Sequence, residues 1–300
     1  MGMTDKQFDA YQARLLKRLK IAQEQFKEKG ESKELAELIS EIEAELKKAV
    51  TFPFDPNILH DEQFPRSNKY DPMWIFKNQM GPNPLWFMEL LTQHLDLKPG
   101  MRVLDLGCGK GITSVFLARE FGVQVYAVDL WENADGKWEQ AKAHGVEDLI
   151  VPLQADARSL PFAKNFFDAV ICVDAYIYFG QDESYLETIL NFLRPGGKIG
   201  VIVPGFMKDV ANGVPDYLTK FLGDELWTWQ TLSWWKNLWE QTGLVTINTA
   251  DTPQNGFALW LRWEETLISA GMNKHPDELE IFKQDNGEYM GFIRLVATKK

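Results

Sequence analysis

The stretch that decides the fold is Val103-Leu104-Asp105-Leu106-Gly107-Cys108-Gly109-Lys110-Gly111, an apolar run followed by glycine at three alternate positions. The apolar run and the helix-like segment from Ile112 to Glu120 indicate a strand, a tight turn and a helix. Glycine tolerates positive φ and lets a ligand lie against the main chain where a Cβ would clash. The stretch therefore predicts a turn that binds a nucleotide cofactor, although tight strand–helix packing without a ligand is the alternative.

The spacing of the glycines argues against a dinucleotide fingerprint. A G-x-G-x-x-G pattern that starts at Gly107 needs a third glycine at position 112, where the chain has Ile112. A second strand pattern, residues 123–129, ends on Asp129, and an acid at that point can accept hydrogen bonds from ribose hydroxyls. Alternatively, Asp129 caps a helix that begins near Glu132.

Taken together, the string Asp105-x-Gly107-x-Gly109-x-Gly111 resembles motif I of the class I S-adenosylmethionine-dependent methyltransferases. Three later segments resemble further elements of that family in the same order along the chain. Residues 153–157 resemble its third strand, 167–174 its fourth, and 193–199 its turn into strand five. The resemblance spans roughly residues 75 to 300. It implies a small-molecule methyltransferase of the ubiquinone or cyclopropane type, with the fold of an α/β doubly wound, seven-stranded, mostly parallel sheet (Rossmann-like) in which strand seven inserts antiparallel between strands five and six.

The resemblance also implies the cofactor, S-adenosyl-L-methionine, with S-adenosyl-L-homocysteine as the product. The residues that it assigns to the cofactor are Asn78, Asp105, Gly107, Cys108, Gly109, Gly111, Asp129, Leu130, Asp156, Ala157 and Val173. Asp156 takes the place of the acid that hydrogen-bonds the adenine amino group, and a plain turn residue is its alternative. Asn78 and Gln79 lie in the segment before motif I, which in related enzymes closes over the methionine end of the cofactor. These two residues could contact the carboxylate or amine of that end, or they could only hold a loop together.

Catalytic residues are less constrained than cofactor residues. Methyl transfer from a sulfonium is an in-line displacement, so positioning and exclusion of water suffice unless the acceptor must lose a proton. At the end of strand four, Asp174 could accept a proton or bind an ammonium, and Tyr176 or Tyr178 could orient an acceptor. His60 is retained because it lies in an arm that could cover the site. The alternative for each is ordinary packing, and the histidines show no metal-binding spacing.

The remaining sequence divides into a hairpin, an arm and a domain. Residues 1–50 carry apolar side chains at the helical period, among them Leu15, Leu19 and Ala22, and Gly30 with Ser32 as an N-cap separates two helices. The hairpin could form a homodimer, cover the cofactor cleft or pack on its own chain. Residues 51–84 are predicted to form an irregular arm or lid, and residues 85–300 are predicted to form the methyltransferase domain.

Two insertions in this domain, at about 205–232 and 250–287, are rich in tryptophan. The tryptophans in and between them are Trp227, Trp229, Trp234, Trp235, Trp239, Trp260 and Trp263. Either they anchor helices to the sheet, or some of them form an aromatic cap that holds a cationic or aromatic substrate.

Charge and composition narrow the class of acceptor. The formal net charge of −11 argues against a nucleic-acid partner. Two cysteines and the lack of an apolar signal region or membrane-length run favour a cytoplasmic enzyme. Strand four also lacks the Asn/Asp-Pro-Pro-Tyr string of base and amide methyltransferases. We therefore expect a small-molecule acceptor, with a protein or tRNA methyltransferase and a non-catalytic sensor or scaffold as the alternatives.

Overall fold

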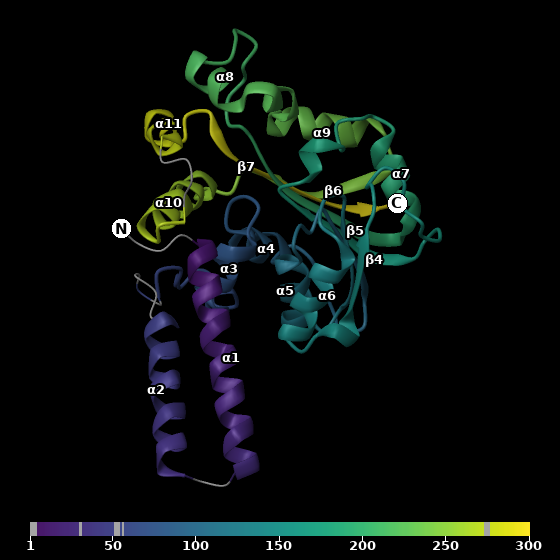
Figure 1. Ribbon diagram of the computed structural model, residues 1–300. Helices are drawn as coiled ribbons and strands as arrows, with labels where there is room; N and C mark the ends of the chain where they lie inside the picture. The colour runs from purple at the N-terminus through teal and green to yellow at the C-terminus, as the bar shows by residue number, and fades with distance from the viewer. Residues whose placement is uncertain (1–4, 30–31, 51–54, 56, 273–276) are drawn as a thin grey trace. The chain divides into compact units, whose positions relative to one another are not determined.

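The computed structural model describes residues 5–29, 32–50, 55, 57–272 and 277–300 (Figure 1). The chain divides between residues 56 and 57 into two compact units. The first contains helices α1 (Asp5–Lys29) and α2 (Lys33–Val50), which pack against one another and confirm the predicted helical hairpin. The Oγ of Ser32 accepts a hydrogen bond from the N–H of Leu35 at 3.2 Å, as an N-cap should. Gly30, the predicted end of the first helix, lies outside the described residues.

The second unit is built on a seven-stranded sheet with the order β3-β2-β1-β4-β5-β7-β6. Its strands are β1 (Arg102–Leu106), β2 (Gln124–Asp129), β3 (Ile150–Gln154), β4 (Phe167–Val173), β5 (Leu193–Phe206), β6 (Val245–Asp251) and β7 (Met290–Lys299). All neighbouring strands are parallel except β7, which pairs antiparallel with both β5 and β6 (Figure 1). This topology confirms the predicted α/β fold.

Helices alternate with the strands and cover the sheet. The helical elements are η1 (Ser67–Lys69), α3 (Pro72–Asn78), α4 (Pro84–Thr92), α5 (Ile112–Phe121), α6 (Ala134–Ala143), η2 (Glu147–Leu149), η3 (Tyr176–Tyr178), α7 (Tyr185–Phe192), α8 (Asp216–Leu222), η4 (Gly223–Thr228), α9 (Leu232–Gln241), α10 (Gly256–Ser269) and α11 (Glu278–Asp285). Because helices cover the sheet, the central strands are mainly apolar, and every residue of β1 after Arg102 is buried, Asp105 included.

The segment predicted as an irregular arm contains a helix that the sequence prediction missed. Asp71 caps α3 by accepting a hydrogen bond from the N–H of Met73 at 2.9 Å, and Pro72 occupies the first helical position. The next helix, α4, begins as predicted, with the Oδ1 of Asn83 accepting from the N–H of Leu85 at 3.0 Å. The arm thus contributes ordered helical walls beside the sheet.

The order of the strands fixes where a ligand can bind. From β1 the chain proceeds to β2 and β3 on one side, and from β4 to β5 on the other, so the direction switches between β1 and β4. In open α/β sheets the loops on either side of such a switch diverge and leave a crevice at the carboxyl ends of the strands. The glycine turn follows β1 and Asp174 follows β4, so both lie at this crevice.

Candidate active site

A cavity of about 400 Å³ opens at the carboxyl ends of β1, β2 and β4. Its size is within the range of small-molecule and cofactor sites. Most of the residues assigned to the cofactor line it, namely Asn78, Gly107, Cys108, Gly109, Asp129, Leu130, Asp156, Ala157 and Val173. Asp174, Tyr178 and Gln79 line it as well. Most of the predicted cofactor residues therefore lie around one cavity.

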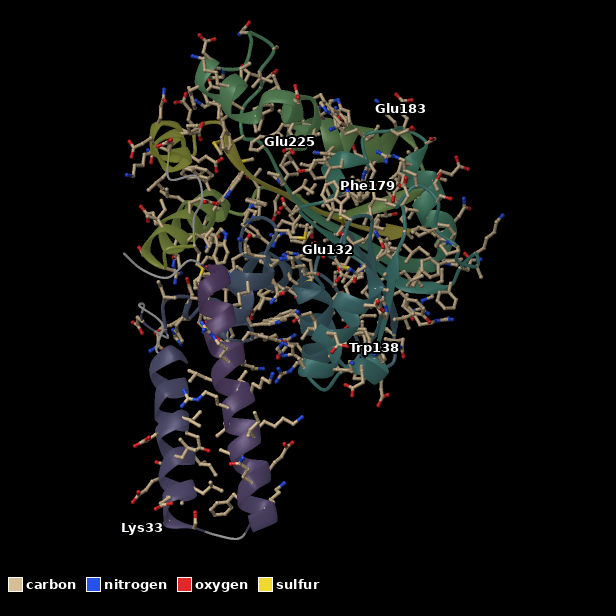
Figure 2. The ribbon with its side chains drawn as sticks, viewed as in Figure 1. Lys33, Glu132, Trp138, Phe179, Glu183 and Glu225 are labelled. Atoms are coloured by element: carbon tan, nitrogen blue, oxygen red, sulfur yellow. The ribbon has the colours of Figure 1, made fainter. Side chains whose placement is uncertain are left out.

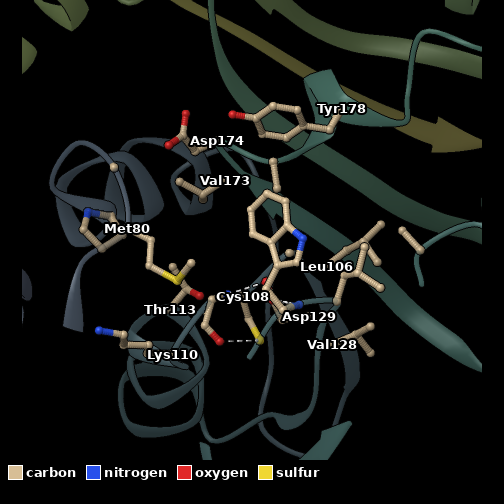
Figure 3. A pocket seen from close by; sticks show the side chains of 18 of the residues that line it. Met80, Leu106, Cys108, Lys110, Thr113, Val128, Asp129, Val173, Asp174 and Tyr178 are labelled. Atoms are coloured by element: carbon tan, nitrogen blue, oxygen red, sulfur yellow. Dashed lines mark hydrogen bonds between the residues drawn. The ribbon is translucent and has the colours of Figure 1, made fainter. Parts of the chain in front are cut away.

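The glycine turn lies against its neighbours so closely that side chains are excluded. Gly107 and Gly109 have φ angles of 74° and 52°, in the left-handed region that favours glycine. A Cβ on Gly107 would overlap the Cβ of Ala175, and one on Gly109 would lie 2.9 Å from the Sδ of Met80. The turn thereby offers bare main chain to the cavity, as close approach of a ligand requires (Figure 3).

Asp129 is held at the edge of the cavity by backbone donors. Its Oδ2 accepts from the N–H of Gly109 at 2.9 Å, and its Oδ1 accepts from the N–H groups of Trp131 and Glu132 at 2.9 and 3.0 Å. A carboxylate has about four acceptor positions, so about one remains for a ligand hydroxyl. The alternative that Asp129 caps the next helix is wrong, because Asn133 is the N-cap of α6.

Asp105 and Gly111, which were also assigned to the cofactor, do not line the cavity. Asp105 is 1% exposed, and its Oδ2 accepts hydrogen bonds from the hydroxyls of Thr113 and Ser114 at 2.7 and 2.6 Å. Burial raises its pKa from 3.8 to about 6, although these hydrogen bonds act in the opposite direction. Gly111 precedes the first residue of α5 with a φ of 90°. Both residues therefore fix the start of α5 and support the turn from behind.

A buried lysine, which sequence reasoning missed, lies beside this supporting carboxylate. Lys137 is 2% exposed, packs against Gly111, and donates from its Nζ to the carbonyl oxygen of Glu132 at 2.7 Å. Its charge lowers the pKa of Asp105 and so offsets part of the effect of burial. Nothing in the local sequence distinguishes Lys137 from Lys142, the exposed lysine of the same helix, because the burial of Lys137 depends on the packing of α6 against the turn.

Asp174 follows β4 in a conformation that is unusual for a residue with a side chain. Its φ is 70°, and its Oδ2 packs against the Cα of Gly81. Among the described residues, none donates a hydrogen bond to its carboxylate. Burial, and after it the charge of Glu225, raises its pKa from 3.8 to about 7.

Tyr178 lies on the same side of the cavity as Asp174. Figure 3 shows the hydroxyl of Tyr178 and the carboxyl of Asp174 facing one another. The Tyr178 hydroxyl donates weakly to both oxygens of Glu225, at 3.5 and 3.4 Å, and Glu225 lines the cavity too. Burial and the charges of both acids raise the pKa of Tyr178, so it remains a hydroxyl donor at neutral pH.

Two of the four candidate catalytic residues lie outside the cavity. Tyr176 is fully buried in the core, where its ring packs 5.6 Å from that of Trp235 and 5.9 Å from that of Trp239. It points away because η3 turns the chain after β4 and directs Tyr176 and Tyr178 to different environments. His60 is exposed, and its carbonyl oxygen accepts from Arg262 at 2.9 Å. Neither residue lines the cavity.

The seven clustered tryptophans do not line the cavity either, so the structure gives the aromatic-cap hypothesis no support. Trp235, Trp239 and Trp263 are fully buried, as helix anchors are. A different tryptophan, Trp131, lines the cavity, is 68% exposed, and packs edge-to-face against Tyr178 at 6.2 Å. Its position two residues after Asp129 is a signal that could have found it.

The remaining polar lining residues are held by local hydrogen bonds. The amide of Asn78 donates to the carbonyl of Trp74 and accepts from Gln140, at 2.8 and 3.2 Å. The Oε1 of Gln79 accepts from the N–H of Gly81 at 3.1 Å. Asp156 accepts from the N–H of Arg158 at 2.8 Å, as a turn residue does. These bonds position the side chains and leave further donors and acceptors for a ligand.

Cys108 lines the cavity, and burial raises the pKa of its thiol well above the ordinary value, so it is no reactive thiolate. Within the described residues, no group of three His, Cys, Asp or Glu side chains is arranged to hold a metal ion. In the same part of the chain, no helix is both long and apolar enough to span a bilayer.

Comparison with known proteins identifies the segment that carries the turn. Residues 104–201 match the family model described as a methyltransferase domain. Methyltransferase GfsG of Streptomyces halstedii is 32% identical over 130 residues, which are 42% of this chain and 47% of that protein. The chain thus spans less than half the length of the curated relatives that it matches.

Solved structures extend the likeness beyond the matched segment. The geranyl diphosphate C-methyltransferase of Streptomyces coelicolor, in complex with S-adenosyl-L-homocysteine, is 17% identical with a TM-score of 0.60, over 72% of this chain and 77% of that one. The phosphoethanolamine N-methyltransferase 2 of Haemonchus contortus, in complex with S-adenosyl-L-methionine, is 21% identical with a TM-score of 0.63, over 81% and 59%. At these identities the likeness shows the fold alone. The chain thus matches a methyltransferase domain over residues 104–201 and is similar in fold to these two methyltransferases.

Proposed function

We propose that the protein transfers the methyl group of S-adenosyl-L-methionine to a small-molecule acceptor in the cavity described above. One observation carries the proposal. The bare main chain of the glycine turn and the carboxylates of Asp129 and Asp156 line the same cavity as the unpartnered carboxylate of Asp174. A cofactor held by the first three groups would leave the side with Asp174 for the acceptor.

The residues fit this cofactor by shape and by chemistry. The turn at Gly107 and Gly109 leaves space against the main chain, Asp129 keeps an acceptor position for a hydroxyl, and Asp156 provides a second carboxylate for a base amino group. Asn78 and Gln79 contribute amides at the arm side. When bound, the cofactor supplies an activated methyl group on a sulfonium.

The protein's own residues would then position the acceptor and manage its proton. The cavity walls are mainly apolar, including Phe87, Phe292 and Trp131, and exclude water from the reacting atoms. The Tyr178 hydroxyl donates a hydrogen bond that orients a polar group of the acceptor. Asp174 accepts a proton, because a carboxyl with a pKa of about 7 exchanges protons readily at neutral pH.

Calorimetric titration with S-adenosyl-L-methionine and S-adenosyl-L-homocysteine tests the proposal. We expect Asp129→Ala to weaken the binding of both by about 10- to 100-fold, the loss of one charge-assisted hydrogen bond. Asp135→Ala, on an exposed position of α6, is the matched control and should leave both affinities unchanged. A transfer assay with a labelled methyl group and a metabolite panel then identifies the acceptor. Failure of the wild-type protein to bind either nucleoside refutes the proposal.

We also propose that the acceptor is not a nucleic acid, that the protein is cytoplasmic, and that its hairpin pairs with a second copy of the chain. The net charge of −11 supports an acceptor other than nucleic acid, and the two buried free cysteines support a reducing compartment such as the cytoplasm. Exposed Leu16 and Ile21 on α1 support pairing of the hairpin with a second copy. Sedimentation velocity of the wild type and of Leu16→Glu tests the pairing, and a monomeric wild type at micromolar concentration refutes it.

A further inference from the structure

The acceptor side of the cavity is anionic and aromatic. Four lining residues carry carboxylates, Asp129, Asp156, Asp174 and Glu225, whereas only Lys110 and Arg158 carry cationic groups. Asp129 and Asp156 are held by backbone N–H groups of the loops that carry them. The carboxylates of Asp174 and Glu225 remain for the acceptor side.

Both cationic lining residues are directed elsewhere. The Nζ of Lys110 donates to the carbonyl of Lys77 at 3.2 Å, and Figure 3 shows Lys110 on the opposite side of the cavity from Asp174. The guanidinium of Arg158 donates to the carbonyl of Tyr178 at 2.9 Å and lies 3.7 Å from a carboxylate oxygen of Asp156. Among the described lining residues, no cation therefore neutralises Asp174.

Aromatic rings surround this acidic side. Tyr178 connects the two acids, because its hydroxyl faces Asp174 and lies 3.4 Å from Glu225. Trp131 packs edge-to-face against Tyr178 and exposes its ring to the cavity. Carboxylates combined with the faces of aromatic rings attract cations, and they repel phosphates and carboxylates.

Building on the proposed function, we infer that the acceptor is an amine that enters as its ammonium, with Asp174 and Glu225 as its counter-charges and Trp131 and Tyr178 as its aromatic walls. Asp174 removes one proton from the ammonium and becomes a neutral carboxylic acid. The freed lone pair on nitrogen forms the new N–C bond while the C–S bond breaks and its electron pair returns to sulfur. The product is a methylated ammonium and a neutral thioether.

Three probes that share one apolar body test the inference. Benzylamine is cationic at neutral pH, benzyl alcohol is neutral and phenylacetate is anionic. Each is titrated into the protein saturated with S-adenosyl-L-homocysteine. We expect benzylamine to bind at least about tenfold more tightly than benzyl alcohol, the effect of one charge-assisted hydrogen bond, and phenylacetate to bind most weakly.

Substitution then assigns the preference to its residue. Asp174→Asn should remove most of the difference between benzylamine and benzyl alcohol, and S-adenosyl-L-homocysteine should still bind. Glu183→Gln removes the same charge from an exposed residue outside the cavity, labelled with Glu225 in Figure 2, and should preserve the preference.

The outcomes separate this inference from the proposed function. If neither S-adenosyl-L-methionine nor S-adenosyl-L-homocysteine binds the wild type, the proposed function fails. If S-adenosyl-L-homocysteine binds and the three probes bind equally, or the anion binds best, only the amine inference is overturned. It is also overturned if magnesium ion alone displaces benzylamine, because the carboxylates would then hold a metal ion in place of an amine. A third contrary outcome is that Asp174→Asn weakens the binding of S-adenosyl-L-methionine relative to that of S-adenosyl-L-homocysteine without changing the preference among the probes. Asp174 would then interact with the sulfonium of the cofactor.

Discussion

Replacing Asp105 with asparagine should stabilise the protein at neutral pH and leave its stability at pH 4 nearly unchanged. Asp105 is 1% exposed, and burial raises its pKa from 3.8 to about 6. The folded protein therefore retains a proton that the unfolded chain releases between these pH values. The stabilising contribution of the protonated carboxyl is full below pH 3.8 and is lost as the pH rises to 6.

The size of the effect follows from the same shift. The pKa of Asp105 is about two units higher in the folded protein than in the unfolded chain, and this difference corresponds to about 3 kcal/mol of unfolding free energy at pH 7. Asparagine carries no charge, and its side-chain oxygen still accepts hydrogen bonds from Thr113 and Ser114, which donate at 2.7 and 2.6 Å in the wild type. The variant should avoid most of the penalty and unfold at a correspondingly higher urea concentration.

Urea unfolding at pH 4 and pH 7, followed by circular dichroism, measures this difference. Asp96→Asn is the control, because its side chain is 73% exposed and its removal should change neither value by more than about 0.5 kcal/mol. Equal effects of Asp105→Asn at both pH values would refute the reasoning. So would destabilisation at pH 7, which would mean that the ionised carboxylate is needed to hold the two hydroxyls.

Three further predictions concern the turn and the acceptor side. Lys137→Met should lower the free energy of unfolding, measured in urea, by about 1.5 to 3 kcal/mol, because the hydrogen bond and the counter-charge of a buried cation are lost. The control is Lys142→Met, at a half-exposed position of the same helix, which should lower the free energy of unfolding by less than about 1 kcal/mol. Gly107→Ala should destabilise more than Gly100→Ala, because both have positive φ but only the Cβ at 107 overlaps a neighbour; equal losses would refute the overlap. Benzylamine binding should weaken below about pH 7, because Asp174, whose titratable neighbours are Glu225, Tyr178 and Cys172, then takes up a proton and loses its charge. Isothermal titration at pH 6 and pH 8 should show this weakening in the wild type and not in Asp174→Asn.

Local patterns in the sequence predicted the individual strands and the turn, whereas the resemblance to the methyltransferase family supplied the topology of the sheet and its antiparallel last strand. Alternating glycines, apolar strands and an acid at a strand end are read directly from neighbouring residues. Asn83 and Pro84 likewise marked the start of α4 correctly. Local patterns and the family resemblance together therefore led to residues that line one cavity.

Predictions that depended on the direction of a side chain were less accurate. Asp105 belongs to the motif but faces Thr113 and Ser114, because alternate residues of β1 point to opposite faces of the sheet. Tyr176 and Tyr178 are two residues apart, and only the geometry of η3 decides which one reaches the cavity. The contribution of Glu225 depends on a contact with a residue 47 positions away, which no local pattern contains.

The residues that line the cavity come partly from inside and partly from outside the matched family segment. The matched family segment, residues 104–201, contains the glycine turn, Asp129 and Asp156, whereas Met80, Gly81, Glu225 and Phe292 lie outside it. Changes in these outer residues would alter which acceptor fits without disturbing the segment by which relatives are recognised. Proteins that match the same segment can therefore differ in these outer walls, and comparison of the walls should help to sort such proteins by acceptor.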